Sequence, residues 1–256
     1  VYVFDNASKD NIDILDKAFP HVNFSKNKKN IGFAKAINQL IAKTTSSEVL
    51  ILNPDTYVNR GFFESMLNFM NENPDIGIIG PKIFENNGMI QGSARSFPTP
   101  MTALFGRRSI MTKLFPKNIL TRKNILNNGS SGNTPMDVDW VSGACMLVRR
   151  KAFEEAGVMD ENFFMYWEDA DWCRRMIQKD WRVVYYPEAS IIHFSGKSSD
   201  RNLIQSVVEF HKSAYYLFNK YYPDFFGIMR VIVMMVLGVR VCFLLTVVGI
   251  RSMYKK

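Results

Sequence analysis

Cysteine is scarce in this chain, and two of its segments contain no acidic residue. Its three cysteines are widely spaced, which provides no disulfide framework or zinc spacing and favours a reducing compartment. Residues 101–136 and 225–256 hold eleven Lys and Arg without any Asp or Glu, although the whole chain has a net charge of +8. Because a nucleic-acid-binding protein would carry its basic excess on the folded body, we predict contact with an anionic membrane surface and none with nucleic acid.

Common nucleotide-binding signatures and internal repeats are also missing. The chain has no P-loop and no glycine-rich dinucleotide loop, since the segment 30–38 contains one glycine, Gly32. Small residues there would let a phosphate or ribose approach the start of a helix, with helix capping as the alternative. The chain begins at Val1 in a strand-like segment without a signal peptide, and we expect a fragment that lacks its natural N-terminus.

Short strands alternate with helices along the chain, which predicts an α/β fold with a largely parallel sheet. We expect strands at residues 1–4, 22–24, 48–52, 76–80, 138–148, 182–186 and 189–193. We expect helices at residues 11–19, 30–43, 61–71, 150–156, 168–179 and 201–220. A hairpin is predicted around Asn86-Asn87-Gly88, and a flexible loop at residues 127–133.

The C-terminal segment differs from the rest of the chain. Residues 231–250 are apolar apart from Arg240 and Thr246, and this length is sufficient to span a bilayer. Arg240 at the centre would cost roughly 2.5–3.5 kcal/mol on insertion, so a membrane helix that lies in the plane or forms a hairpin is an equal alternative. A buried helix of the domain is a third. We therefore predict a domain at residues 1–222 and a membrane-associating tail at residues 223–256.

Three carboxylates, Glu168, Asp169 and Asp171, lie in an aromatic segment at residues 163–175. A carboxylate that apolar rings partly desolvate has a raised pKa and is a better base. This composition favours a catalytic carboxylate at the start of a helix. The alternative is an acidic first turn that the helix dipole stabilises.

Asp5, Asp55 and His193 each follow an apolar strand. In open α/β sheets, ligands bind beyond the carboxyl ends of strands. Asp55 in the turn Asn53-Pro54-Asp55 suits a hard divalent ion that shares its shell with phosphate oxygens, and His193 suits a further metal ligand. Ordinary turns are the alternative for the two aspartates, and a structural role is the alternative for the histidine.

Taken in order, these segments resemble the inverting family 2 glycosyltransferases with a GT-A fold, especially their rhamnosyltransferase-like branch. The matching segments lie at residues 4–10, 30–38, 52–56, 141–149, 163–175 and 193–196. The resemblance implies a nucleotide-diphospho-sugar transferase fold, in which helices flank a mixed, mostly parallel sheet. The apolar tail would follow this domain.

The resemblance also implies roles for individual residues. The catalytic base is expected to be Asp169, with Glu168 beside it. Residues expected to contact the donor are Asp5, Asn6, Asn30, Gly32 and Asn53. Residues expected to contact the acceptor are Trp140, Ser142, Gly143, Trp167 and Asp171. For Glu168 and Asp171 the alternative is that they orient the helix. Asp55 and His193 are expected to hold a divalent metal, Mn²⁺ or Mg²⁺, with Asn53 at the first acidic position of the family's Asp-x-Asp motif.

The implied activity is transfer of a sugar, with rhamnose favoured, from a nucleotide-diphosphate donor to a hydroxyl of a glycan or polyprenyl-linked acceptor. We expect inversion, a role in cell-surface polysaccharide synthesis, and a location at the cytoplasmic side of the inner or plasma membrane, peripheral or with one C-terminal membrane segment. The family's first strand, with its Thr-Tyr-Asn-like motif, has no counterpart in this chain. A truncated, non-catalytic binding module is therefore the alternative, and a sugar nucleotidyltransferase is a third reading.

Overall fold

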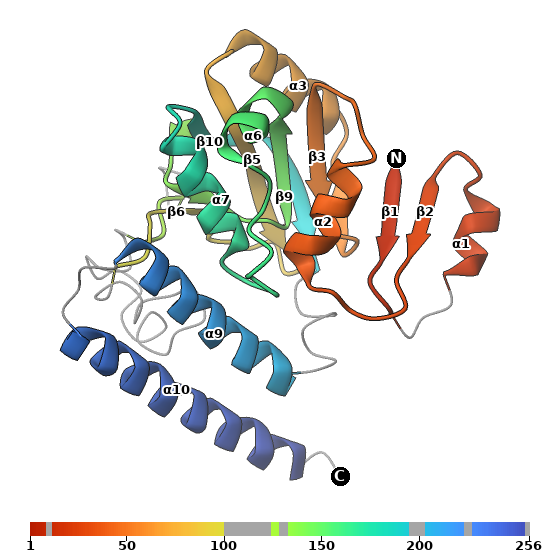
Figure 1. The fold of residues 1–256 in the computed structure, drawn as a ribbon. Coiled ribbons are helices and arrows are strands. Elements are labelled where there is room, and N and C mark those ends of the chain that lie inside the picture. Colours follow the sequence, from red (N-terminus) through yellow and green to blue (C-terminus); the bar gives the residue numbers. More distant parts are fainter. Residues whose placement is uncertain (9–11, 100–123, 128–132, 195–202, 223–226, 254–256) are drawn as a thin grey trace.

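Helices cover both faces of a central mixed sheet, and two long helices lie beside this domain (Figure 1). The computed structural model describes residues 1–8, 12–99, 124–127, 133–194, 203–222 and 227–253. Most of the predicted basic stretch at 101–136 and much of the predicted loop at 127–133 lie outside the described residues.

The first half of the chain contains β1 (Tyr2–Asp5), α1 (Asp13–Ala18), β2 (Asn23–Lys26), α2 (Phe33–Ile41), β3 (Glu48–Leu52), β4 (Thr56–Val58), α3 (Phe62–Glu72), β5 (Ile76–Glu85) and β6 (Ala94–Arg95). The second half contains β7 (Met136–Asp137), β8 (Trp140–Val141), β9 (Cys145–Arg149), α6 (Arg150–Ala156), α7 (Glu168–Ile177), β10 (Arg182–His193), α9 (Leu203–Tyr221) and α10 (Gly227–Met253). The predicted ranges of β3 and α6 are confirmed residue for residue. The two strands predicted at 182–186 and 189–193 form one strand, β10, with an irregular register between Tyr186 and Ser190.

Six strands form the main sheet in the order β3-β9-β5-β10-β4, with β7 paired to β10. Among the strands that the structure describes in this sheet, β5 and β10 are the one parallel pair, and the other four pairs are antiparallel. A mixed sheet flanked by helices is confirmed, but the prediction that it is mostly parallel is wrong. The reason is that β9 enters between β3 and β5 and runs antiparallel to both.

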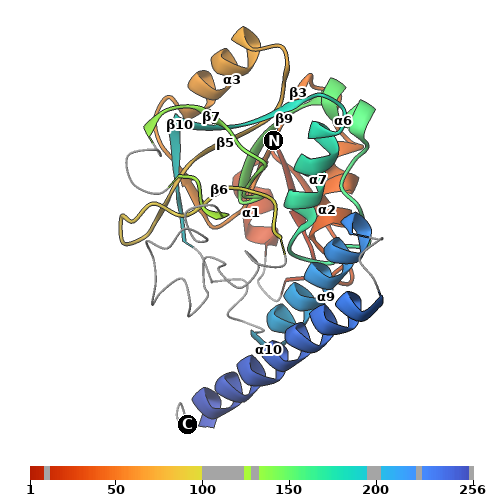
Figure 2. The same ribbon diagram turned by 90° about the vertical axis from the view of Figure 1, so that its left-hand side faces the viewer.

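Successive residues of the strands face opposite sides of the sheet and build two apolar cores. In β9, Met146 and Val148 pack in one core with residues of α2, α6 and α7, whereas Cys145 and Leu147 pack in the other with residues of α3. Figures 1 and 2 show these two layers of helices on opposite faces. Burial of both faces explains why the strands are nearly continuous apolar runs.

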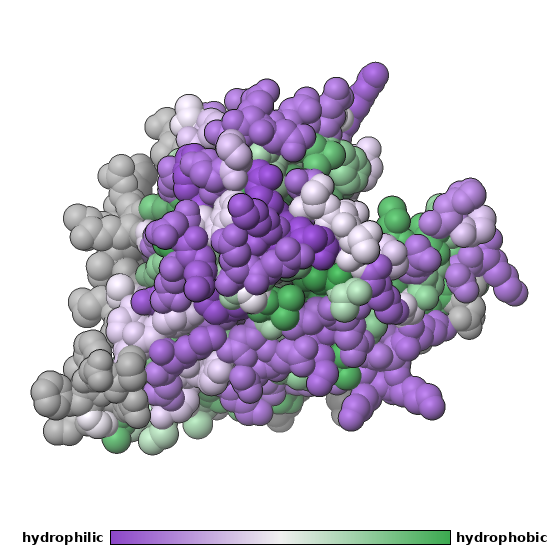
Figure 3. Space-filling model, turned by 45° about the horizontal axis from the view of Figure 1, so that its top comes forward, coloured by the Kyte–Doolittle hydropathy of each residue, from purple (hydrophilic) through white to green (hydrophobic). Residues whose placement is uncertain are grey.

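The N-terminal strands form a separate pair. β1 and β2 are parallel, with Tyr2 opposite Asn23, and no described strand joins them to the main sheet. Apolar side chains of this unit are exposed, among them Val1 at 83% and Ile14 at 67%. Figure 3 shows apolar side chains gathered there, at the right, whereas much of the remaining visible face is hydrophilic.

The predicted tail forms α10, which runs antiparallel to α9; we call this pair the α9–α10 hairpin (Figures 1 and 2). Several apolar side chains of α10 are 46–71% exposed, namely Val231, Met234, Met235, Val236, Val239 and Phe243. The alternative of a buried helix of the domain is therefore wrong. Over the residues open to description, no helix combines the length and apolarity needed to cross a membrane.

Candidate active site

The predicted catalytic carboxylate lies at the start of α7, after a strained turn. Tyr166 and Trp167 precede the helix with φ of 71° each, a left-handed conformation that bulky residues adopt only under constraint. Aromatic packing supplies this constraint, because the Trp167 ring lies 6.0 Å from that of Trp140 and 5.3 Å from that of Phe210. The turn thereby orients the acidic first residues of α7.

Backbone amides hold the carboxylate of Asp169. Its Oδ2 accepts a hydrogen bond from Gly143 N–H at 2.9 Å, and its Oδ1 accepts one from Ala170 N–H at 2.8 Å. Burial raises the pKa of Asp169, and the two amides and the positive charge of Arg95 offset this only in part. A Cβ at Gly143 would lie 3.4 Å from the Asp169 Cβ, which is an ordinary van der Waals contact, so this approach does not itself require glycine.

Glu168 lies beside Asp169 but is turned into the protein interior. Its side chain is 6% exposed, and its Oε2 has no hydrogen-bond partner among the described residues. Burial, followed by the charge of Asp169, raises the pKa of Glu168 well above its ordinary value. We therefore assign the proton of this coupled pair to Glu168 and the negative charge to Asp169, which the amides and Arg95 favour in its charged form.

Pairing of β4 with β10 brings the two predicted metal ligands together. Thr56 lies opposite His193 in this antiparallel pair, and the preceding residue is Asp55. His193 Nε2 lies 3.2 Å from Asp55 Oδ1, with the two side chains 12% and 14% exposed. The second ring nitrogen, Nδ1, lies 3.5 Å from the side-chain amide of Gln91, which helps to orient the ring.

The donor atoms of Asp55 and His193 suit a divalent ion. A carboxylate oxygen suits both Mn²⁺ and Mg²⁺, and an imidazole nitrogen favours the transition metal, Mn²⁺. No group of three or more His, Cys, Asp or Glu side chains is placed to hold a metal within the described ranges. An ion held by this pair would therefore take its remaining ligands from diphosphate oxygens or water.

A short series of contacts joins the metal pair to the carboxylate of Asp169. Asn53 N–H donates to the carbonyl of Ala144 at 3.0 Å, one residue after Gly143, whose amide binds Asp169. Asp55 follows Asn53 by two residues. The two acids and His193 thus lie along one end of the sheet. We call this end the catalytic edge, and it comprises residues 53–55, 142–144, 166–170 and 193.

Asn6, Asn30 and Gly32, which we predicted to contact the donor, contact one another before α2. Asn6 Nδ2 donates hydrogen bonds to Asn30 Oδ1 and to the Gly32 carbonyl, both at 3.0 Å. Gly32 has a φ of +89°, and a Cβ there would lie 2.6 Å from the carbonyl oxygen of Phe164. The same oxygen accepts a hydrogen bond from Phe33 N–H at 2.7 Å. The space predicted for a phosphate above Gly32 is thus filled by the segment that precedes α7.

The two other donor predictions fall on local turns. Asp5 Oδ1 accepts a hydrogen bond from Ser8 N–H at 2.9 Å, so the turn alternative accounts for its position. Asn53 is half-buried, and its carbonyl accepts a hydrogen bond from Thr56 Oγ1 at 2.6 Å. Contact between the donor and any of these residues stays a prediction.

Burial contradicts two of the acceptor predictions. Trp140 is 8% exposed, donates its indole N–H to the Ser96 carbonyl at 3.0 Å, and has Arg95 over its ring at 5.2 Å. Asp171 is 0% exposed, and its carboxylate is bound by Arg175, Lys220 and Tyr221. Trp140 therefore fills the core and Asp171 anchors α9 to α7, because local sequence does not distinguish a ligand contact from an interior one.

The remaining acceptor predictions lie at the catalytic edge. Ser142 donates its backbone N–H to the Ser93 carbonyl at 3.1 Å, which fixes the turn that presents Gly143 to Asp169. Trp167 is half-buried, and its indole N–H has no partner among the described residues. Gly143 positions the base, and acceptor contact at these three residues stays a prediction.

Arg95 and Gln91 were not predicted, although one lowers the pKa of Asp169 and the other orients His193. Arg95 lies in the two-residue strand β6, and Gln91 lies in the irregular segment before it. Gln91 ends the hairpin predicted around Asn86-Asn87-Gly88, which the structure confirms, since its N–H donates to the Ile83 carbonyl at 2.8 Å. Arg95 belongs to no periodic segment or recognisable motif, and the pairing of β6 with β8 brings it to the catalytic edge.

Comparison with known proteins identifies the family. The model of Glycosyl transferase family 2 matches residues 1–157. The chain belongs to this family. It is 30% identical over 227 residues to the N-acetylglucosaminyl-diphospho-decaprenol L-rhamnosyltransferase of Mycobacterium tuberculosis, which covers 84% of this chain and 73% of that relative. It is 40% identical over 58 residues to the rhamnosyltransferase WbbL of Escherichia coli, which covers 23% of this chain and 22% of WbbL.

Two solved structures share the fold. GalNAc-T7 with UDP, GalNAc and Mn²⁺ has a TM-score of 0.53 at 13% identity, over 75% of this chain and 37% of that one. The mannosyltransferase PcManGT from Pyrobaculum calidifontis, in complex with GDP-Man and Mn²⁺, has a TM-score of 0.53 at 14% identity, over 86% and 54%. These likenesses confirm a GT-A-like α/β fold. This family 2 glycosyltransferase is rhamnosyltransferase-like and resembles enzymes of cell-surface glycan synthesis, and the nucleotidyltransferase reading is set aside.

Proposed function

We propose that this protein transfers a sugar, rhamnose by preference, from a nucleotide-diphosphate donor to a hydroxyl of a polyprenyl-linked glycan, with inversion. The observation that carries the proposal is the catalytic edge, where a chain of hydrogen bonds and neighbouring residues links Asp169 to Asp55, which contacts His193. The names of the mycobacterial and E. coli relatives support the sugar and the lipid carrier.

Asp169 acts as the general base. It removes the proton of the acceptor hydroxyl as that oxygen attacks the anomeric carbon from the face opposite the leaving diphosphate, which inverts the configuration. The amides of Gly143 and Ala170 fix the carboxylate in one orientation, and the protonated neighbour Glu168 spares it a second negative charge. Because burial raises the pKa of Asp169, the carboxylate is a stronger base than an exposed aspartate.

Asp55 and His193 would hold the divalent ion, and Mn²⁺ fits their mixed oxygen and nitrogen donors. When bound, such an ion stabilises the charge that develops on a leaving diphosphate. Gln91 orients His193 for this contact. The solved GT-A transferases with Mn²⁺ support the choice of metal.

The membrane surface is the proposed place of the reaction. A polyprenyl-linked acceptor is anchored in a bilayer, so its hydroxyl is reached from the membrane surface. The exposed apolar side chains of α10 and the absence of acidic residues from 225–256 in the sequence suit peripheral contact with anionic lipid. We place this contact on the cytoplasmic side of the membrane.

Substitution Asp169→Asn tests the base. It keeps the side-chain shape and the hydrogen bond from Gly143, but it removes the basic oxygen, so kcat is expected to fall roughly 10²–10⁴-fold. The measurement is transfer of rhamnose from its nucleotide-diphosphate donor to a lipid-linked acceptor with Mn²⁺ present. Asp137→Asn is the control, because this carboxylate is 64% exposed and pairs with Arg182 on β10. Near-normal transfer by the Asp169→Asn protein would show that another group is the base.

A non-catalytic binding module is the second candidate. One observation favours it: β1, which carries Asp5, pairs with β2 and with no other described strand, so the donor side is not tied into the main sheet. Calorimetry with a nucleoside diphosphate and Mn²⁺, combined with the transfer assay, separates the candidates. Failure of the folded protein to bind the nucleoside diphosphate, together with absent transfer, would favour the module.

A further inference from the structure

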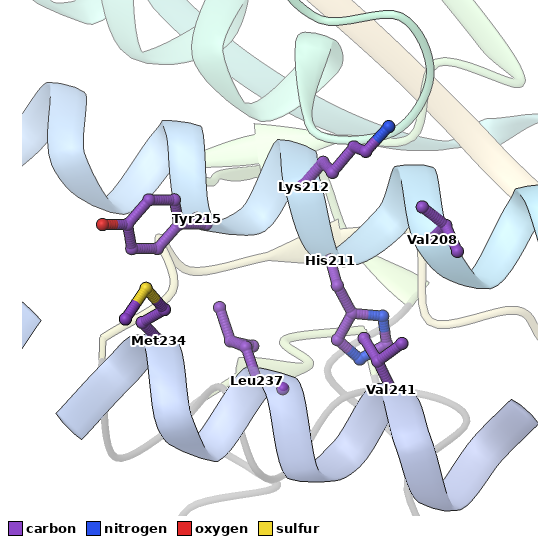
Figure 4. Close-up of a pocket in the computed structure, with 8 residues that line it drawn as sticks. Val208, His211, Lys212, Tyr215, Met234, Leu237 and Val241 are labelled. Atoms are coloured by element: carbon purple, nitrogen blue, oxygen red, sulfur yellow. The ribbon is translucent and has the colours of Figure 1, made fainter. Parts of the chain in front are cut away.

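A pocket of about 220 Å³ lies between the two helices of the α9–α10 hairpin (Figure 4). Figure 4 shows Met234, Leu237 and Val241 pointing from α10 toward α9. Val208 and Tyr215 contribute from the α9 side. At Gly238, which also lines the pocket, a Cβ would meet no atom within 4 Å, so the absence of a side chain keeps the space open. The lining therefore suits an apolar chain and not a sugar.

His211 is a polar side chain that faces this pocket from α9 (Figure 4). It is 5% exposed, and its Nδ1 lies 2.7 Å from the Val207 carbonyl, which accepts its proton. The other nitrogen, Nε2, has no hydrogen-bond partner in the part of the chain that the structure describes. A buried polar atom without a partner costs free energy, so we expect the ligand of this pocket to carry a polar group beside its apolar chain.

Arg240 is the one charged residue in the apolar segment 231–250, and it is half-buried in the hairpin. Its guanidinium carbon lies 6.0 Å from the centre of the Phe210 ring. No ion pair joins Arg240 to any acidic side chain among the described residues. Burial lowers the pKa of Arg240, which is the sign of a cation held without a counter-charge. The arrangement calls for an anion from outside the protein.

Aromatic contacts connect this place to the catalytic edge. The Phe210 ring lies 5.3 Å from Trp167 and 5.6 Å from Tyr166, the two residues of the strained turn before Glu168 and Asp169. One layer of rings therefore separates Arg240 and the pocket from the segment that carries the base. A ligand held by the hairpin would lie next to the reacting groups.

We propose that the α9–α10 hairpin binds the lipid carrier of the acceptor: the pocket holds isoprene units, and Arg240 binds the diphosphate that joins them to the glycan. The inference rests on the proposed function and names the substrate part that this surface recognises. Charge complementarity supports the choice, because the segment 225–256 offers cations and no acid to a diphosphate. The aromatic contact with the catalytic edge favours an acceptor carrier over bulk membrane lipid.

Binding of farnesyl diphosphate to the whole chain, without donor, tests the site. Calorimetry is carried out on the unaltered protein, on Arg240→Gln and on Gly238→Leu, which fills the pocket and raises helix propensity. Each substitution is expected to weaken binding by about tenfold or more, since one removes a charge-assisted contact and the other the space for the chain. Val239→Ala is the matched control, because Val239 is 71% exposed on the neighbouring position and does not line the pocket.

Three outcomes would overturn the proposal. Farnesyl diphosphate could bind all variants equally; inorganic diphosphate could bind as tightly as farnesyl diphosphate; or the substitutions could weaken attachment to phosphatidylglycerol vesicles without changing farnesyl diphosphate affinity. The last outcome would assign the hairpin to general membrane contact. The expected result includes unchanged farnesyl diphosphate binding by Asp169→Asn, so a wrong base assignment leaves this result intact. Normal farnesyl diphosphate binding by the Arg240→Gln protein would rule out the proposed carrier site, but it would not contradict the proposed transfer reaction.

Discussion

Asp169 at the catalytic edge and Arg240 in the α9–α10 hairpin are both half-buried charges, but their surroundings differ. Asp169 is bound by two backbone amides and lies near Arg95, and these groups offset part of the cost of burying its charge. Arg240 lies over an aromatic ring, and no described acidic side chain pairs with it. The carboxylate of Asp169 is therefore fixed in place by the protein, whereas the charge of Arg240 has no fixed counter-charge among the described residues, as the proposed carrier site requires.

A third set of charges holds the two regions together. Asp171, two residues after Asp169, is fully buried and is bound by Lys220 and Tyr221 of α9. Lys220 also donates a hydrogen bond to Asp160. Burial raises the pKa of Asp160, but the hydrogen bonds from Lys220 and Asn162 outweigh this effect and lower the pKa to about 2. These fully satisfied groups dock α9 against the domain and so fix the hairpin beside the base.

Asp171→Asn is expected to break this connection and to cause the largest loss of unfolding free energy among these substitutions. It leaves Lys220 and Arg175 without their shared buried counter-charge, so the free energy of unfolding should fall by about 3 kcal/mol. Urea denaturation measures the change. Asp75→Asn is the control, because this side chain is 56% exposed in its pair with Arg182 and should cost less than about 1 kcal/mol. Equal losses in the two proteins would mean that the Asp171 network does not dock α9.

Gly32→Ala disturbs the catalytic edge and leaves the hairpin unchanged. The substitution forces a positive φ on alanine and drives its Cβ against the Phe164 carbonyl, so we expect a loss of about 2 kcal/mol in unfolding free energy. Thermal unfolding is the measurement. Gly157→Ala separates the two causes, since Gly157 has φ 81° and ψ 160°, close to the 89° and 167° of Gly32, and its Cβ would meet only the flexible end of Arg175 at 3.3 Å. A loss no larger than that of Gly157→Ala would exclude the contact with Phe164 as a cause.

Arg95→Gln tests how the charge of Asp169 is stabilised, and of these substitutions we expect it to change the protein least. Arg95 lowers the pKa of Asp169, so its loss should raise that pKa further. Because the base acts in its ionised form, activity is lost as pH falls through this pKa, and the acid limb of kcat/KM should move to higher pH. The pH profile of transfer measures it, and Arg95→Lys should restore the original limb. A limb that stays in place in the Gln variant would show that Arg95 does not act on the base.

Much of the site was predictable because its polar residues stand in recognisable order. The acidic aromatic segment around Asp169, the Asn53-Pro54-Asp55 turn and His193 at a strand end were all identified from local pattern, and the structure brings them to one end of the sheet. Strand β3 and helix α6 were likewise predicted to the residue. Periodicity and turn chemistry act over a few residues, so local sequence is enough to indicate them.

Long-range packing decided the rest. Gly143 binds Asp169 from 26 positions away, and the antiparallel entry of β9 between β3 and β5 places it there. The same packing buries Trp140 and Asp171, which local pattern suggested for the acceptor, and it brings Arg95 beside the base. Residue order could therefore indicate the family and the candidate groups of its site. Which of them are charged, buried or in contact depended on distant segments meeting in three dimensions, because desolvation and hydrogen bonding are set by neighbours in space.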